Sequence, residues 1–171
     1  RKLIYDDKYS FYKIDPFPEK KFFDDYYNDC FPSVMGFSRQ MIKERDIEHF
    51  ELINKKIYKD VNKKQNILNF GSGNGGISLL LRSKDFKVFN FDYSEPSEIG
   101  FKEDYHFIND FNQIKEDIKF DLIYSSHSLE HVIDIKDTLN KFKKFSHSKT
   151  LYFFEVPNGY DQNYIRPPHT Y

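Results

Sequence analysis

The sequence has 171 residues, a length that suits one globular domain with its own core. Its 26 basic and 27 acidic side chains give a net charge of −1, which argues against a surface for nucleic acid or for an anionic membrane, and no apolar run is long enough to span a bilayer. The single cysteine, Cys30, excludes an internal disulfide framework, and no secretory signal opens the sequence, so we expect a cytoplasmic protein.

The N-terminal third predicts an arm followed by a helix. Residues 1–35 combine aromatic and charged side chains with Pro16, Pro18 and Pro32, which is typical of a loosely structured arm. In residues 37–60 the apolar positions recur at mixed three- and four-residue steps, which predicts an amphipathic helix.

From Asn66 onward, short apolar runs alternate with amphipathic stretches. The apolar runs, which we predict to be strands, are residues 67–70, 87–91, 105–108, 120–124 and 150–156. The amphipathic stretches, which we predict to be helices, are residues 76–83 and 134–146. This alternation predicts an α/β fold with a doubly wound, mainly parallel, Rossmann-like sheet and helices on both faces. We therefore expect an arm and helix over residues 1–60 and an α/β domain over residues 61–171.

A glycine-rich turn joins the first predicted strand of this domain to its helix, with the sequence Gly71-Ser72-Gly73-Asn74-Gly75-Gly76. Glycines permit a tight turn and a close approach of a ligand to the backbone, and the helix N-terminus offers N–H groups to an anionic group. The spacing fits both the G-x-G-x-x-G pattern of dinucleotide sites and a tighter G-x-G-x-G pattern. In both, an acid at the end of the next strand binds ribose hydroxyls, and Asp92 occupies that place.

More polar residues follow the third and fourth predicted strands. Asp110 and Phe111 come after the third strand, where a carboxylate and a phenyl ring could bind an adenine. His127, Glu130 and His131 come after the fourth strand, at the edge where open α/β sheets bind ligands. If this segment is helical, the three side chains share one face, which permits a histidine base whose tautomer Glu130 fixes. A divalent metal site and a structural helix anchor are the alternatives.

Taken together and in their order along the sequence, these motifs resemble those of the class I S-adenosylmethionine-dependent methyltransferases. The resemblance covers roughly residues 60–171. The segments that carry the resemblance are Leu68-Asn69-Phe70-Gly71-Ser72-Gly73-Asn74-Gly75, Asp92, Asp110, Phe120-Asp121-Leu122-Ile123, His127-Ser128-Leu129-Glu130-His131-Val132 and Glu155-Val156-Pro157-Asn158. The resemblance implies the following places around S-adenosylmethionine: Gly71, Gly73 and Gly75 under its methionine part, Asn69 near its ammonium group, Asp92 on its ribose, Asp110 and Phe111 facing its adenine, and His127 near its sulfonium. The family usually has Asp or Glu at the position of Asn69.

The same resemblance implies methyl transfer to a small-molecule acceptor, in the branch that methylates small molecules and bacterial sugars. A sugar or sugar nucleotide of surface-polysaccharide synthesis is the expected acceptor. Related enzymes hold a divalent metal with E-x-x-E-H segments, so the tentative metal ligands are His127, Glu130, His131 and His169, a set that suits Mn, Fe or Zn. The resemblance also implies an arm that closes over the cofactor pocket as a lid. It implies further strands after the fifth, so the edge of the sheet is expected to be unfinished.

Two other functions remain as alternatives. The G-x-G-x-x-G spacing also suits an NAD-dependent oxidoreductase, although the segment from His127 to Val132 argues against that class. A non-catalytic module that binds a cofactor or a partner is favoured by Asn69. The sequence indicates no nucleic-acid or membrane partner, and it specifies no oligomeric state.

Overall fold

The computed structural model describes residues 2–8, 11–16, 19–26, 42–57, 65–93 and 106–157. The chain divides into two compact units, Arg1–Phe37 and Ser38–Tyr171. Helix α3 (Glu44–Ile57) belongs to the second unit, where it contacts α4 (Gly76–Arg82). The boundary expected at residue 60 therefore moves to residues 37 and 38, because α3 packs with the sheet domain.

The first unit contains a hairpin of two antiparallel strands, β1 (Lys2–Asp6) and β2 (Phe11–Asp15), and the helix α1 (Lys20–Asp25). The prediction of a loosely structured arm missed this hairpin. β-Branched and aromatic residues favour strands, and Pro16 follows β2 without interrupting it. The proline thus marks the end of a strand and does not exclude one.

The second unit is built on a five-stranded sheet in which every strand pair is parallel, with the order β5-β4-β3-β6-β7. The strands are β3 (Asn66–Phe70), β4 (Lys87–Phe91), β5 (His106–Ile108), β6 (Phe120–Ser126) and β7 (Ser146–Glu155). The direction of winding reverses between β3 and β6, so their carboxyl ends form the switch point at which open α/β sheets bind ligands. The predicted α/β fold is confirmed.

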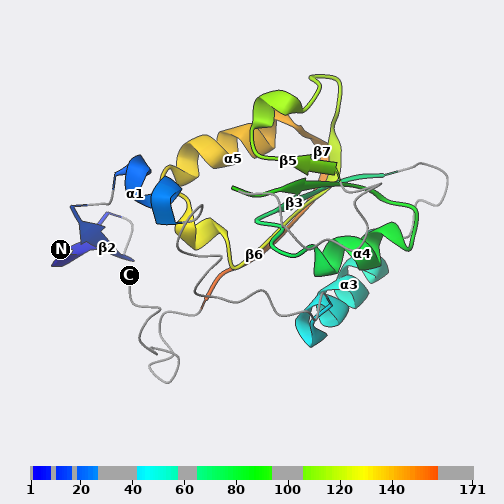
Figure 1. Cartoon of the computed structure of the whole chain (residues 1–171), viewed down its shortest axis with the longest axis horizontal. Helices are drawn as coiled ribbons and strands as arrows, with labels where there is room; N and C mark the ends of the chain where they lie inside the picture. Colours follow the sequence, from blue (N-terminus) through cyan, green and yellow to red (C-terminus); the bar gives the residue numbers. More distant parts are fainter. Residues whose placement is uncertain are drawn as a thin grey trace. The chain divides into compact units, whose positions relative to one another are not determined.

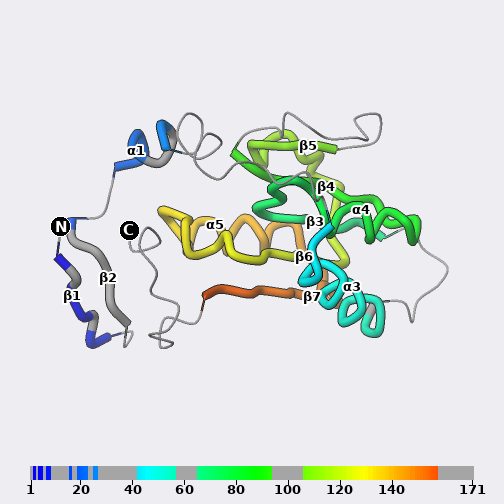
Figure 2. Tube along the Cα trace, turned by 60° about the horizontal axis from the view of Figure 1, so that its bottom comes forward, coloured from blue at the N-terminus to red at the C-terminus, as the bar shows by residue number. Residues whose placement is uncertain are grey.

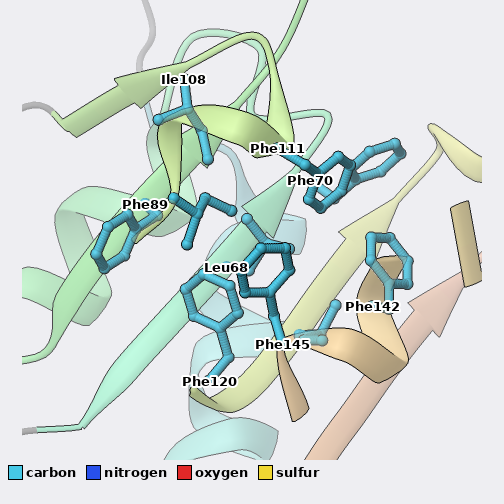
Figure 3. Close-up of a cluster of buried hydrophobic side chains, with 10 residues drawn as sticks. Leu68, Phe70, Phe89, Ile108, Phe111, Phe120, Phe142 and Phe145 are labelled. Atoms are coloured by element: carbon cyan, nitrogen blue, oxygen red, sulfur yellow. The ribbon is translucent and has the colours of Figure 1, made fainter. Parts of the chain in front are cut away.

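Helices cover both faces of this sheet, with α5 (Ile135–Lys144) on one side and α3 and α4 on the other (Figures 1 and 2). Side chains alternate along β3, so that Leu68 and Phe70 face α5 whereas Ile67 faces α3 and α4. Figure 3 shows the aromatic cluster on the α5 side, which consists of Leu68, Phe70, Phe89, Ile108, Phe111, Ile114, Phe120, Ile123, Phe142 and Phe145. The cluster on the other side consists of Ile53, Ile67, Ile77, Leu81, Phe86, Val88, Leu122 and Tyr124. Both clusters fix the strands whose ends carry the predicted site.

Several boundaries differ from the sequence-based expectation by a few residues, among them the start of β7 and the end of β6. β7 begins at Ser146, earlier than the expected residue 150, because pairing of Ser146 with Phe120 extends it into a polar stretch. The segment after β6 forms a short 3₁₀ helix, η4 (Leu129–His131). β7 lies at an edge of the sheet as described, and further strands beyond it stay a prediction. Within the described ranges, no helix is long and apolar enough to cross a membrane.

Candidate active site

The glycine loop between β3 and α4 packs tightly on one side and is open on the other. Gly71, Gly73 and Gly75 have φ angles of 74°, 51° and 77°, which L side chains rarely adopt. A Cβ on Gly71 would lie 1.8 Å from Ser128 Oγ and 2.3 Å from Ser128 Cβ, so the chain after β6 packs directly against this glycine. A Cβ on Gly73 would meet no atom within 4 Å. A ligand can therefore approach the backbone at Gly73.

Asp92, directly after β4, braces this loop. Its Oδ2 accepts a hydrogen bond from the Gly73 N–H at 2.7 Å, and its Oδ1 accepts one from the Tyr93 N–H at 2.7 Å. Burial raises the pKa of Asp92 above its usual value, against the opposing effect of these two hydrogen bonds. A carboxylate has about four lone-pair positions, so Asp92 retains capacity for ribose hydroxyls beside the open part of the loop. Its role on the ribose stays a prediction.

Asn69 is buried in β3 beneath the loop, with 1% of its surface exposed. Its Nδ2 donates to Ser78 Oγ at 2.8 Å, and Ser78 Oγ donates to Asn90 Oδ1, so the group connects β3, α4 and β4. In the described part of the chain, Asn69 Oδ1 has no hydrogen-bond partner. A buried acceptor without a partner is unfavourable, and a ligand N–H group is one way to supply the missing donor.

Asp110 and Phe111 occupy different surroundings, although they are adjacent in sequence. Exposed Asp110 caps the 3₁₀ helix η3 (Phe111–Gln113): its Oδ1 accepts from the Asn112 N–H at 2.9 Å. Phe111 is only 8% exposed and packs against Phe91, with the ring centroids 4.6 Å apart. Phe111 is thus part of the aromatic core, and contact of either residue with an adenine stays a prediction.

η4 brings together the three ionisable residues after β6. Glu130 Oε1 lies 3.8 Å from His127 Nδ1 and 3.7 Å from His131 Nε2. Burial raises the pKa of Glu130, while the neighbouring His127 acts in the opposite direction. The two imidazole side chains are 42% and 41% exposed, so an acceptor molecule can reach them. His127, Glu130 and His131 lie close together, as expected. Their catalytic role stays a prediction.

Sequence reasoning missed two residues that join this cluster, Glu155 at the end of β7 and His49 on α3. Glu155 Oε2 lies 3.4 Å from His127 Nε2, and Glu155 Oε1 lies 3.4 Å from His49 Nε2. The rule that selected His127 also selects Glu155, because Glu155 ends the strand that pairs with β6. His49 had a weaker signal: it shares one helix face with Asp46 and Ile53, and all three are buried.

The electrostatic surroundings keep Glu155 ionised. Burial alone would raise the pKa of Glu155, but the hydrogen bond from Ser126 Oγ and the nearby His49 outweigh it. The pKa of Glu155 is therefore lowered from its usual value. A negative charge thus faces the Nε2 side of His127 at neutral pH.

The structure gives the metal alternative no support. Within the described ranges, no group of three or more His, Cys, Asp or Glu side chains is arranged to hold a metal ion. His169, the tentative fourth ligand, lies outside those ranges.

Most of the chain matches a known protein family. Residues 41–168 match the family described as a methyltransferase domain. A comparison with curated proteins found no match. Among solved structures, coclaurine N-methyltransferase bound to N-methylheliamine and S-adenosylhomocysteine is 18% identical, with a TM-score of 0.50 over 83% of this chain and 45% of that chain.

Two bacterial structures are also similar. The S-adenosylmethionine-dependent methyltransferase from Agrobacterium tumefaciens is 16% identical, with a TM-score of 0.49 over 64% of this chain and 44% of that chain. The methyltransferase from Geobacter sulfurreducens, in complex with S-adenosylhomocysteine, is 13% identical, with a TM-score of 0.48 over 72% of this chain and 51% of that chain. The chain spans about half the length of these proteins.

The family match covers most of the sequence, from α3 through the whole sheet. It includes the glycine loop, Asp92 and the cluster after β6. The chain belongs to the methyltransferase domain family, within the class I S-adenosylmethionine-dependent superfamily.

Proposed function

We propose that this domain transfers a methyl group from S-adenosylmethionine to a small-molecule acceptor. The observation that carries the proposal is the position of an open glycine loop, braced by Asp92, on the same sheet edge as the cluster of His127 and Glu130. When bound, S-adenosylmethionine supplies an electrophilic methyl group on a sulfonium. The residues of the chain bind it, place the acceptor and accept the acceptor's proton.

Three features of the β3–β4 edge fit this cofactor. Gly73 has no Cβ, and no other atom fills the space where a Cβ would lie, so a ligand can lie directly on the backbone there. Asp92 has lone pairs left for two ribose hydroxyls. The unpartnered Oδ1 of Asn69 is an acceptor for an ammonium group, a neutral substitute for the carboxylate that the family usually has there. Asp110, at the surface beyond β5, is the polar group proposed for the adenine.

The acceptor side is assigned to the cluster after β6. We assign the general base to His127 or His131, since imidazole titrates near neutral pH, with Glu130 close enough to either ring to orient it. Methyl transfer is an in-line displacement, so placement of the acceptor oxygen or nitrogen contributes as much as proton removal. If neither histidine takes the proton, the segment acts as a structural anchor and the rate depends on placement alone.

The proposed acceptor class is a polar small molecule, with a sugar or sugar nucleotide of bacterial surface-polysaccharide synthesis as the leading candidate. Support comes from the resemblance to the sugar-modifying branch and from the carboxylate and imidazole groups, which hydrogen-bond hydroxyl groups well. Coclaurine N-methyltransferase was solved with the small molecule N-methylheliamine, so small-molecule binding occurs on this fold. A cytoplasmic location stays a prediction.

A methyl-transfer screen tests the proposal. The protein is incubated with S-adenosylmethionine carrying a ¹³C-labelled methyl group and with panels of sugar nucleotides, free sugars and small amines. We expect S-adenosylhomocysteine to form only with an acceptor, together with a labelled product. Binding of S-adenosylhomocysteine without transfer to any panel would favour the alternative of a non-catalytic module.

A further inference from the structure

We propose that Glu155 is a positioning residue for His127 and that His49, on α3, positions Glu155 in turn. The inference deepens the proposed function, because it assumes that His127 acts at the acceptor. It gives a role to Glu155, which the resemblance includes without one, and adds His49 and helix α3 to a site predicted after β3, β4, β5 and β6.

Glu155 contacts His127 through both its backbone and its side chain. The backbone N–H of His127 donates to the Glu155 backbone oxygen at 3.0 Å, and His127 Nε2 lies 3.4 Å from Glu155 Oε2. His127 has φ of 52°, a left-handed conformation that is uncommon for residues with a Cβ. The hydrogen bond to β7 stabilises this conformation, in which the imidazole Nε2 faces the carboxylate.

The carboxylate of Glu155 is itself held at both oxygens. Ser126 Oγ donates to Glu155 Oε2, and His49 Nε2 lies 3.4 Å from Glu155 Oε1. Ser126 is on β6 and His49 is on α3, so two elements fix the plane of the carboxyl group. A carboxylate fixed in this way presents one defined oxygen to His127.

His49 has little freedom to turn away from Glu155. It is 6% exposed, its Nδ1 lies 2.9 Å from Tyr124 Oη, and its ring centroid lies 4.7 Å from that of Phe153. Burial raises the pKa of Tyr124 to about 12, so the hydroxyl keeps its proton and can donate to Nδ1. With Nδ1 as the acceptor, the ring proton of His49 lies on Nε2, which donates toward Glu155.

The chain of contacts has a chemical consequence at His127. Both ring nitrogens of His127 face a carboxylate, but Glu155 lies nearer, at 3.4 Å from Nε2 against 3.8 Å from Nδ1 to Glu130, and burial raises the pKa of Glu130 whereas that of Glu155 is lowered. The ionised Glu155 therefore favours a proton at Nε2, which leaves the Nδ1 lone pair for the proton of an acceptor. Arg45 and Asp46 of α3 and His131 of η4 are the other charged or titratable groups around this set. His49 therefore acts through Glu155, without touching the reacting atoms.

Side-chain NMR of the histidines tests the proposal without any acceptor. The protein is labelled with ¹³C and ¹⁵N in histidine, the His127 signals are assigned by their loss in His127→Asn, and three-bond couplings report whether χ1 of His127 has one rotamer. We expect a single rotamer in the wild type and averaging in Glu155→Ala. Glu155→Gln keeps an acceptor oxygen, so it should restore much of the order.

His49→Phe separates hydrogen bonding from packing, because phenylalanine retains a ring against Phe153. We expect it to produce averaging at His127 too, and to add nothing in the Glu155→Ala background, since its effect passes through that carboxylate. Glu116→Gln, at an 89% exposed carboxylate paired with Lys144, is the matched control and should leave His127 unchanged. If His49→Phe is not folded, His49→Asn takes its place in the same comparison.

A folded His49 variant with an unchanged His127 rotamer would overturn the proposal, and so would an additional effect in the Glu155→Ala background. Once an acceptor is known, we expect His49→Phe to lower kcat by about 10- to 100-fold, less than loss of a base can cost, with the Kd for S-adenosylhomocysteine unchanged. If no acceptor is methylated, the proposed function is wrong, but the NMR experiment still shows whether Glu155 and His49 position His127. If methyl transfer occurs but the His127 rotamer does not change in the His49 variant, only the positioning proposal is overturned.

Discussion

Asp92, directly after β4, and Glu155, at the end of β7, lie at the same edge of the sheet, yet their surroundings shift their pKa values in opposite directions. Burial dominates at Asp92 and raises its pKa, whereas the hydroxyl of Ser126 and the adjacent histidines overcome burial at Glu155 and lower its pKa. This difference suits two tasks. Asp92 gains most when a ligand supplies new hydrogen bonds, and Glu155 keeps a permanent charge beside His127.

The assignment of Asp92 to the ribose predicts a loss of cofactor affinity in Asp92→Ala. Each charge-assisted hydrogen bond contributes about 1.5–3 kcal/mol, so the Kd for S-adenosylhomocysteine should rise at least about tenfold. Because its pKa is raised, Asp92 takes up a proton at a higher pH than an ordinary Asp, and acidification should weaken binding from that pH downward. Asp92→Asn should remove this pH dependence. Calorimetry over a pH series measures both effects, with exposed Asp117→Ala as the control; an unchanged Kd in Asp92→Ala would refute the assignment.

The acid–base role predicts that the histidines after β6 affect turnover and not cofactor binding. His127→Ala and His131→Ala remove imidazoles that are partly exposed at the acceptor side, and a general base contributes about 10²–10⁴-fold to the rate. We expect kcat to fall by that order in at least one variant, with nearly the same Kd for S-adenosylhomocysteine. If the double variant His127→Ala/His131→Ala keeps full activity with and without chelator, the segment after β6 acts only as a structural anchor.

The glycine loop illustrates how one element depends on another. Gly71→Ala should destabilise the fold, because the new Cβ would overlap both Ser128 Oγ and Ser128 Cβ and a change of rotamer moves only the first. Gly73→Ala carries the strain of a positive φ but meets no neighbour, so its cost should be limited to about 1–2 kcal/mol.

Chemical denaturation of the two variants checks this prediction, with Gly73→Ala as the matched control for backbone strain. Gly71→Ala should have the lower free energy of unfolding. Gly73→Ala should show the larger relative loss of S-adenosylhomocysteine affinity, because its methyl group occupies the open side of the loop. Equal stability in the two variants would contradict the packing of the loop against Ser128.

The strands, helices and switch point of the second unit were predictable because their signals are local. The apolar run of β3 ends in glycines, and α5 alternates buried Phe142 with lysines, so periodicity identifies both elements. The positions of Asp92 and His127 after two parallel strands then placed both residues at the same edge of the sheet.

Other features depend on contacts that no local pattern reveals. Phe111 packs into the aromatic core against Phe91, a contact that no local pattern reveals, and its contact with an adenine stays a prediction. His49 lies 75 residues from its partner Tyr124, so sequence alone could not pair the two. The hairpin of β1 and β2 was missed because prolines nearby were interpreted as marking an irregular segment, although they lie outside the strands.

At the scale of the whole molecule, the chain has two units, and the role of the first one is a prediction. The unit Arg1–Phe37 contains exposed Phe22 on α1, and the resemblance to class I enzymes implies that such a segment closes over the bound cofactor. We expect S-adenosylhomocysteine to slow cleavage of this unit in limited proteolysis. Equal cleavage rates with and without the ligand would argue against a lid, and cleavage after Lys84 or Lys87 of the second unit serves as the internal control.

The central claim is that the switch point between β3 and β6 binds S-adenosylmethionine rather than a nicotinamide cofactor. Isothermal titration calorimetry of the whole chain with S-adenosylhomocysteine and, separately, with NADH tests it most directly. We predict saturable binding of about one S-adenosylhomocysteine per chain, weakened in Asp92→Ala, and no binding of NADH. Binding of NADH, or of neither ligand to the folded protein, would contradict the account.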